Sequence, residues 1–240
     1  MESAKEKCRQ EALRRRGMAS SAQRAALREA PQAELLALLQ GDDACLRSAA
    51  AACLAPAVDA VADALLAQLA REPGLYPRLA VCKALQGGNA QTAGRLAAYL
   101  GRIGHNQHRA LPARPSAKRS YPLPRDLAAR TLAKMDPAVF PVLLAALAGE
   151  PRAVREALDA VGWMAFYHPA LATPEACGAV LAAVRRQPED TVLLWKALLC
   201  LSAFPCPQGE AFLRQYAAAP GVLGQEARRS LLLAAAPKSR

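Results

Sequence analysis

LPRDLAARTLAKMDP, residues 123–137, combines a proline that can enter a helix, an arginine near its start, apolar residues at helical spacing and a terminal Asp-Pro. Proline lacks an N–H and fits the first turn of a helix, and it disfavours helical backbone in the residue before it. Apolar residues three and four positions apart form the buried stripe of an amphipathic helix. The stretch therefore predicts one short helix with a defined start and end.

The same pattern recurs along the chain in one register. The stretches that share it are LRSAAAACLAPA from Leu46, PRLAVCKALQGG from Pro77, PRDLAARTLAKM from Pro124 and VREALDAVGWMA from Val154. Their common arginines are Arg47, Arg78, Arg125 and Arg155. The register continues through WKALLCLSA from Trp195 and QEARRSLLL from Gln225, in which the arginine is replaced. This recurrence predicts one type of helix used repeatedly.

Helices of a second type are expected between these stretches. They begin near Ala33, Val61, Thr92, Ala138, Ala176 and Gly209. Asp136-Pro137 and Thr173-Pro174 each place a capping side chain before a proline at the first helical position, which is a helix start signal. Paired helices that repeat every 30 to 47 residues are typical of an α-solenoid. The sequence predicts about six helical hairpins.

Composition supports an all-α fold. Hydrophobic residues make up 53% of the 240 residues and aromatic residues only 5%, and alanine and leucine favour helices. No uncharged run of about 18 apolar residues occurs, and the N-terminal segment is charged, so we expect a cytoplasmic protein without membrane insertion. We treat residues 1–240 as one domain, with basic N-terminal helices in residues 1–30.

DPAVFPVLLAALAGEPRAVREALDAVG, residues 136–162, resembles the HEAT repeat family, as does ELLALLQGDDACLRSAAAACL, residues 34–54. The shared features are an apolar first helix, a short turn with Asp or Pro, and a second helix with Val-Arg or Leu-Arg near its start. The resemblance covers residues 31–236. It implies an armadillo-like α-α superhelix in which the repeated arginine belongs to contacts between neighbouring repeats. It also implies a scaffold or adaptor that binds a protein partner through its concave face.

One segment interrupts the repeat. GHNQHRALPARPSAKRSYPLP, residues 104–124, contains four prolines and no helical period, so we expect an inserted loop. Insertions in repeat proteins often lie on the binding face. A basic patch in and around this loop is the candidate binding site: Arg102, His105, His108, Arg109, Arg114, Lys118, Arg119, Tyr121, Arg125 and Arg130. The alternative is a solvated basic loop.

Charge is concentrated in the same region. The chain has a net charge of +11, and residues 71–134 contain twelve lysines and arginines against two acidic residues. Such a surface attracts an acidic protein surface, anionic lipid or nucleic acid. A protein partner is the first hypothesis, and nucleic-acid binding is the alternative. Tyr121 is the only aromatic residue of the loop, whereas stacking platforms normally use several rings.

Catalytic and metal motifs are not found. The three histidines form no His-Glu-x-x-His helix, and the seven cysteines include no Cys-x-x-Cys pair. No phosphate-binding glycine loop or nucleophile elbow is present. We therefore expect no catalytic residue, cofactor or metal.

Asp159 and Trp163 lie one helical turn apart, and Trp195 follows in the next unit. This constellation is similar to that of HEAT-like alkylpurine DNA glycosylases, and it connects the nucleic-acid alternative with DNA repair. The competing interpretation is core packing of both tryptophans, because large aromatic rings dominate core burial. A role as a lyase that attaches cofactors to client proteins, known among HEAT-like proteins, is a third alternative that no residue here singles out.

Overall fold

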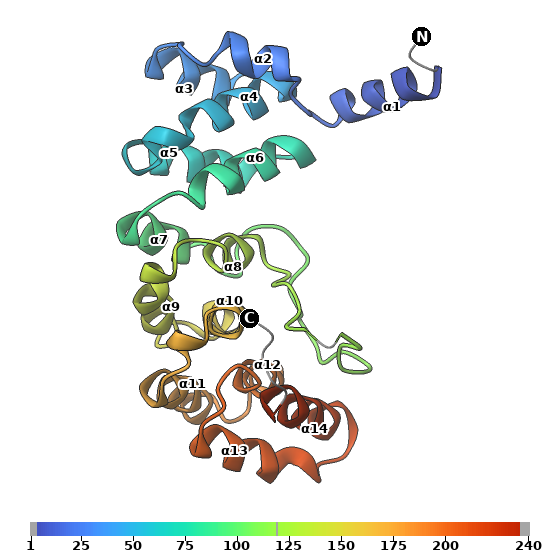
Figure 1. Cartoon of the computed structure of the whole chain (residues 1–240), viewed down its shortest axis with the longest axis vertical. Coiled ribbons are helices and arrows are strands. Elements are labelled where there is room, and N and C mark those ends of the chain that lie inside the picture. Colours follow the sequence, from blue (N-terminus) through green and yellow to red (C-terminus); the bar gives the residue numbers. More distant parts are fainter. Residues whose placement is uncertain (1–3, 119, 236–240) are drawn as a thin grey trace. The chain divides into compact units, whose positions relative to one another are not determined.

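The computed structural model describes residues 4–118 and 120–235, and every regular element within these ranges is a helix (Figure 1). The chain divides into two compact units, unit 1 (Met1–Arg95) and unit 2 (Leu96–Arg240), and the division falls inside helix α7 (Ala90–Ala97). The all-α class predicted from the sequence is confirmed.

Unit 1 is built from short helices. They are α1 (Ala4–Arg15), α2 (Ser21–Ala26), α3 (Gln32–Gln40), α4 (Ala44–Leu54), the 3-10 turn η1 (Ala55–Ala57), α5 (Val58–Arg71) and α6 (Leu75–Leu85). Each helix from α2 to α4 packs on the helix two positions further along the chain. Helix α4 packs on α3 and α6, and α5 packs on α3 and α6. Small residues in the middle of α4, such as Ala49, Ala50 and Ala51, are fully buried and allow the close approach of α6.

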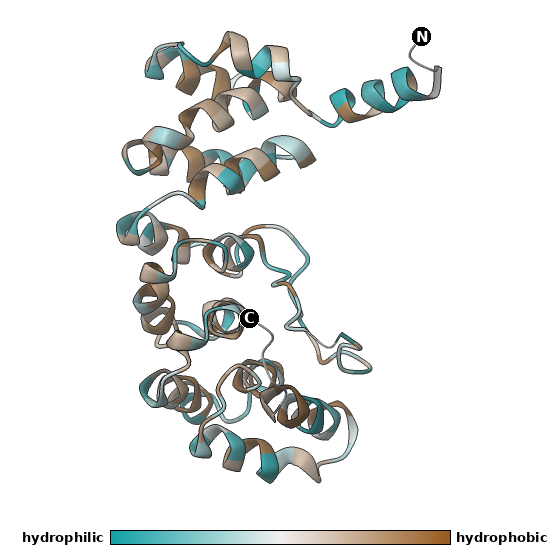
Figure 2. Ribbon diagram, in the orientation of Figure 1, coloured by the Kyte–Doolittle hydropathy of each residue, from teal (hydrophilic) through white to brown (hydrophobic). Residues whose placement is uncertain are grey.

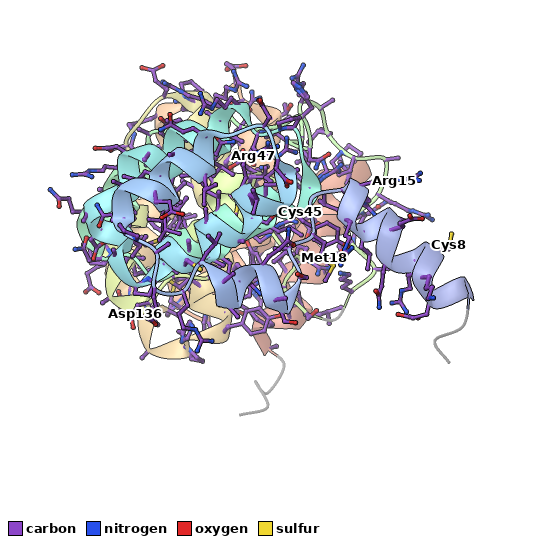
Figure 3. All side chains as sticks on the ribbon, turned by 90° about the horizontal axis from the view of Figure 1, so that it is seen from above. Cys8, Arg15, Met18, Cys45, Arg47 and Asp136 are labelled. Carbon is purple, nitrogen blue, oxygen red and sulfur yellow. The ribbon has the colours of Figure 1, made fainter. Side chains whose placement is uncertain are left out.

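Helices α1 and α2 occupy the segment predicted to form basic N-terminal helices. Figure 2 shows that α1 is mainly hydrophilic, and Figure 3 shows it extending away from the packed helices of unit 1, with Cys8 and Arg15 on it. In contrast, Cys45 and Arg47 lie on α4 among the packed helices. One contact between α1 and the rest of unit 1 is made by the Cys45 thiol, which donates to the carbonyl oxygen of Arg14.

Unit 2 holds the remaining helices. They are α8 (Leu127–Leu132), the 3-10 turn η2 (Pro137–Val139), α9 (Phe140–Ala146), α10 (Pro151–Tyr167), the 3-10 turn η3 (Pro169–Leu171), α11 (Pro174–Arg186), α12 (Thr191–Leu201), α13 (Pro207–Ala217) and α14 (Gly221–Ala235). Even-numbered helices pack in the order α8, α10, α12, α14, and odd-numbered helices in the order α9, α11, α13. Unit 2 therefore has two helical layers (Figure 1).

The predicted start signals cap helices as expected. The Asp136 carboxylate accepts from the Ala138 N–H at the start of η2, and the Thr173 hydroxyl accepts from the Ala176 N–H at the start of α11. Pro137 and Pro174 follow these caps at the first helical position. Because the missing proline N–H would be unpaired there in any case, these positions tolerate proline without loss of a hydrogen bond.

The helical run Ala44–Arg71, which contains α4, η1 and α5, is long and apolar enough to cross a membrane by length and composition. Half of its most apolar part is buried inside the protein. Core helices of globular domains share this length and composition, and the buried faces of α4 and α5 form the core of unit 1.

The arginine shared by the repeats connects consecutive hairpins in unit 1. Arg47 on α4 donates through Nε and Nη2 to both carboxylate oxygens of Glu72, at 2.8 and 3.0 Å. Its Nη1 also donates to the carbonyl oxygens of Gly41 and Asp42. Glu72 is only 1% exposed, and although burial opposes its charge, Arg47, Gln68 and Gly74 hold the pKa of this carboxyl below its usual value. The pair fixes the turn after α5 against α4.

Replacement of Arg47 by methionine should lower the free energy of unfolding of unit 1 by about 3–5 kcal/mol, because it leaves the Glu72 carboxylate buried without its cation. Urea denaturation followed by circular dichroism measures the effect. Arg24→Met is the control: this side chain is exposed, and its loss should change stability by less than about 0.5 kcal/mol. A loss below about 1 kcal/mol for Arg47→Met would show that the pair contributes little.

Candidate functional site

The chain between α7 and α8 contains no helix, and Tyr121 attaches it to the core of unit 2. Tyr121 is 2% exposed, and its ring centre lies 5.8 Å from that of Phe166. Its hydroxyl occupies the space beside Gly162 of α10, where an added Cβ would come within 2.0 Å of the Tyr121 oxygen. Only glycine at position 162 leaves room for this ring, so the helix and the loop are shaped to fit each other.

Two further contacts hold the 104–124 loop. Near its start, the Gln107 side-chain amide donates to the Asp126 carboxylate at 2.7 Å, and Asp126 also caps α8. Near its end, Arg229 of α14 donates to the carbonyl oxygens of Lys118 and Ser120, at 2.9 and 3.3 Å. The loop is thus anchored at both ends and through Tyr121.

Beneath the loop lies a buried group of charges, which we call the polar cluster: Lys196 of α12 with Glu156 and Asp159 of α10. Lys196 is completely buried, and its ammonium donates to Glu156 Oε2 at 2.8 Å and to Asp159 Oδ2 at 2.9 Å. Residues three apart on a helix share a face, so both carboxylates of α10 point at α12. The cluster joins two hairpins through a charge network in the core.

Burial governs the protonation of the polar cluster. It raises the pKa of Glu156 to about 7, because the Lys196 ammonium compensates only part of the lost hydration and the Asp159 charge adds to the shift. Burial opposes the charge of Lys196, but Asp159 and Glu156 together raise the pKa of its ammonium. Near neutral pH the cluster therefore holds a charged Lys196 and a Glu156 that is close to its midpoint.

The loop covers this cluster with an aromatic contact. The His108 ring meets the Trp195 ring edge to face, with centroids 4.8 Å apart, and the Trp195 indole N–H donates to Glu226 of α14 at 3.3 Å. Burial and the neighbouring cations Arg125 and Lys196 lower the pKa of His108, so the ring is neutral at pH 7. Because the His108 imidazole is neutral, its packing on the Trp195 indole adds no further buried charge to the site.

Two pockets flank His108, which lines both of them. The apolar pocket, about 280 Å³, is formed mainly by Trp195, Leu199 and Leu123 with three prolines of the loop, and Arg114 and Arg125 also line it. The arginine pocket, about 390 Å³, is lined by Arg109, Arg152, Arg155, Gln107 and Glu156. The two cavities are therefore neighbours beneath one loop.

The predicted patch is exposed in part. Arg102, His105, Arg109, Arg114, Lys118 and Arg125 are exposed, and His108 and Arg130 are half-buried. Tyr121 is buried, so its ring is not available to stack on a ligand. Arg119 lies outside the described residues. No acidic residue occurs between Glu72 and Asp126, and Asp126 is buried, so the charged residues that the described part of the loop exposes are all basic.

The repeated arginines take different roles. Arg155 of α10 donates to the Asp190 carboxylate at 2.7 Å, and Asp190 caps the next even-numbered helix, α12. Arg78 donates to the carbonyl oxygen of Glu72. Arg125 lies beside the His108 ring at 3.4 Å and faces the apolar pocket. Only Arg47 and Arg155 therefore form ion pairs with a following hairpin.

The constellation of Asp159, Trp163 and Trp195 is not a single surface site. Asp159 is 6% exposed and is held by Lys196, and Trp195 is also 6% exposed. Trp163 is half-buried and packs on the Tyr167 ring at 4.5 Å. Asp159 and Trp195 line the apolar pocket, whereas Trp163 is not among its lining residues.

Within residues 4–118 and 120–235, no three histidine, cysteine, aspartate or glutamate side chains come together as a metal site would require. His105 and His108, two residues of the predicted basic patch, differ in environment, because His105 is exposed and His108 packs on Trp195.

Sequence reasoning missed the polar cluster and the contribution of Glu226. The segment from Trp195, through which the repeated register continues, contains Lys196. A single lysine in an otherwise apolar helix is itself a signal, because a fully buried lysine requires partners. The spacing of Glu156 and Asp159 on α10 was the matching signal.

Comparison with known proteins adds no assignment. No protein-family model matches the chain, and no curated protein matches it significantly. Among similar solved structures is the crystal structure of an engineered protein from the Northeast Structural Genomics Consortium. It shares 17% identity, covers 85% of this chain and 98% of its own, and gives a TM-score of 0.37. We base no argument on this similarity.

Substitution of Gly162 by alanine should detach the loop, because the new methyl group would occupy the position of the Tyr121 hydroxyl. Limited trypsin digestion should then cleave after Arg109 and Lys118 at least about tenfold faster than in the parent. Tyr121→Phe is the matched control. Its hydroxyl has no hydrogen-bond partner among the described residues, so removal should leave the loop in place and stability equal or higher. Equal cleavage of Gly162→Ala and the parent would refute this anchor.

Replacement of Glu156 by glutamine should change the pH dependence of stability in a defined direction. Below the usual pKa of 4.5 the carboxyl is protonated in both states. Between there and about 7 the folded state keeps a proton that the unfolded state loses, so rising pH destabilises the parent and not the variant. The variant should therefore gain stability relative to the parent from about pH 5 to about pH 7 and remain level above it. A difference that is constant with pH, measured by urea denaturation, would contradict the assignment.

Proposed function

We propose that this chain is a non-catalytic adaptor of the HEAT-like α-solenoid class, which binds an acidic protein partner through the 104–124 loop and the helices beneath it. The alternation of helices within each unit supports the repeat assignment, as do the ion pairs Arg47–Glu72 and Arg155–Asp190, which connect consecutive hairpins. Stacked helical repeats depend on such contacts between neighbours.

The observation that carries the proposal is the anchored loop, in whose described part the exposed charged residues are all basic. Tyr121, Gln107 and Arg229 hold the backbone, while Arg109, Arg114 and Lys118 remain exposed. A loop that is already ordered loses little entropy when it binds, so its contacts contribute more fully to affinity. Complementary charge also speeds association with an acidic partner.

Nucleic-acid binding is the second candidate, favoured by the same positive charge. The geometry supports it less well. Tyr121 and Trp195 are buried, so neither ring forms an open stacking platform. A glycosylase role has weaker support still, because Asp159 is buried and paired with Lys196.

The test is affinity capture from lysate of the source organism, with and without nuclease, by the parent and by the variant Arg109→Ala/Arg114→Ala/Lys118→Ala. Each exposed ion pair contributes about 0.2–1 kcal/mol, so removing three charges should weaken a protein partner about tenfold. The captured partner should be an acidic protein. Its capture should persist after nuclease treatment and should be lost with the triple variant.

A parallel anisotropy measurement compares a labelled ten-residue glutamate peptide with a labelled random DNA duplex, from about 50 to 200 mM salt. We expect the peptide to bind the parent more tightly than the triple variant. The proposal fails if the captured proteins disappear with nuclease, or if the duplex binds while the peptide does not bind at the lowest salt.

A further inference from the structure

The apolar pocket and the arginine pocket are adjacent but chemically different. His108 lines both, so the two cavities meet at this residue. The first is walled by Trp195, Leu199, Leu123 and prolines of the loop. The second brings Arg109, Arg152 and Arg155 together. A ligand that fits both needs a large apolar group beside a negatively charged group.

The acidic side chains in the apolar pocket are already neutralised. Asp159 accepts from Lys196, and Glu226 accepts from the Trp195 indole and from Arg229 at 2.8 Å. Because these carboxylates are already paired, the pocket does not need a cationic ligand. Its other charged residues, Arg114 and Arg125, are exposed and positive. An apolar group can fill the cavity while a neighbouring carboxylate meets these arginines.

The arginine pocket is suited to carboxylates. Arg109 and Arg152 are exposed, and Arg155 shares its charge with Asp190. Glu156 also lines this pocket, but its carboxyl group is hydrogen-bonded to the Lys196 ammonium. The Gln107 carbonyl oxygen there has no hydrogen-bond partner among the described residues, and its amide is used by Asp126. Planar guanidinium groups recognise carboxylates in two-point contacts, which gives direction as well as affinity.

We propose that the two pockets recognise a short acidic segment of the protein partner, in which one large apolar side chain occupies the apolar pocket and a nearby carboxylate occupies the arginine pocket. This rests on the proposed function and adds the chemistry of the recognised segment. A peptide suits the site better than a nucleic acid, because Tyr121 and Trp195 are buried and offer no open ring on which a base could stack.

Trp195 provides a direct reporter. The chain has two tryptophans, so Trp163→Phe leaves Trp195 as the single tryptophan, in the wall of the apolar pocket, and excitation near the red edge of absorption selects it over the tyrosines. In this background, full-length protein is titrated with two hexapeptides of glutamate and aspartate that differ at one central residue, phenylalanine or alanine. The phenylalanine peptide should shift Trp195 emission saturably and bind about tenfold more tightly than the alanine peptide.

Two variants test the two halves of the site. Leu123 is 39% exposed in the pocket wall, so Leu123→Asp should fold and should abolish the preference for phenylalanine. Arg109→Ala/Arg152→Ala should weaken both peptides by about tenfold and keep the preference. Arg185→Ala, which removes one exposed charge of α11 outside both pockets, should bind as the parent does.

The outcomes separate the two proposals. Equal affinity for the two peptides overturns the two-pocket site and leaves the acidic partner of the proposed function intact. No binding of either peptide at about 50 mM salt overturns both. Binding of N-acetylphenylalanine as tight as that of the phenylalanine peptide overturns the peptide assignment, because the site would then recognise a small aromatic acid.

Discussion

The ammonium of Lys196 imposes the strongest constraint on unit 2. A completely buried cation is stable only with nearby counter-charges, and Glu156 and Asp159 supply them from the adjacent helix. The ion pairs fix α12 against α10, and the cluster must also be covered from water. The 104–124 loop provides part of that cover through His108, which packs on the neighbouring Trp195. Core electrostatics and loop position are thus coupled.

This coupling connects architecture with recognition. A long segment without helices would ordinarily be mobile and would have a high entropic cost of binding. Here three contacts hold the loop. Tyr121 packs against Gly162, the Gln107 side-chain amide donates to Asp126, and Arg229 of α14 donates to the backbone of the loop. Basic side chains, which repel one another, are displayed together on this anchored backbone, and the pockets beneath add an apolar contact. In the proposed interaction with an acidic partner, charge supplies attraction and the pockets supply selectivity.

Local chemistry in the sequence was sufficient for much of the fold. Every helix predicted from the periodic stretches has a counterpart, and Asp136 and Thr173 cap the helices where the prolines indicated. The interruption after α7 was also identifiable from its prolines. Contacts between distant residues could not be identified from the sequence. No local pattern shows that Lys196 contacts residues 37 and 40 positions earlier, or that Tyr121 fits against Gly162. The basic patch was therefore found, whereas the pockets and the buried cluster were not.

The central claim is that the 104–124 loop is ordered in the free protein, and nitrogen-15 relaxation measured by NMR tests it most directly. Backbone order parameters near 0.85, similar to those of α10 and α12, are expected for residues around Gln107 and Tyr121. Values below about 0.6 throughout the loop would describe a flexible segment and would contradict the account.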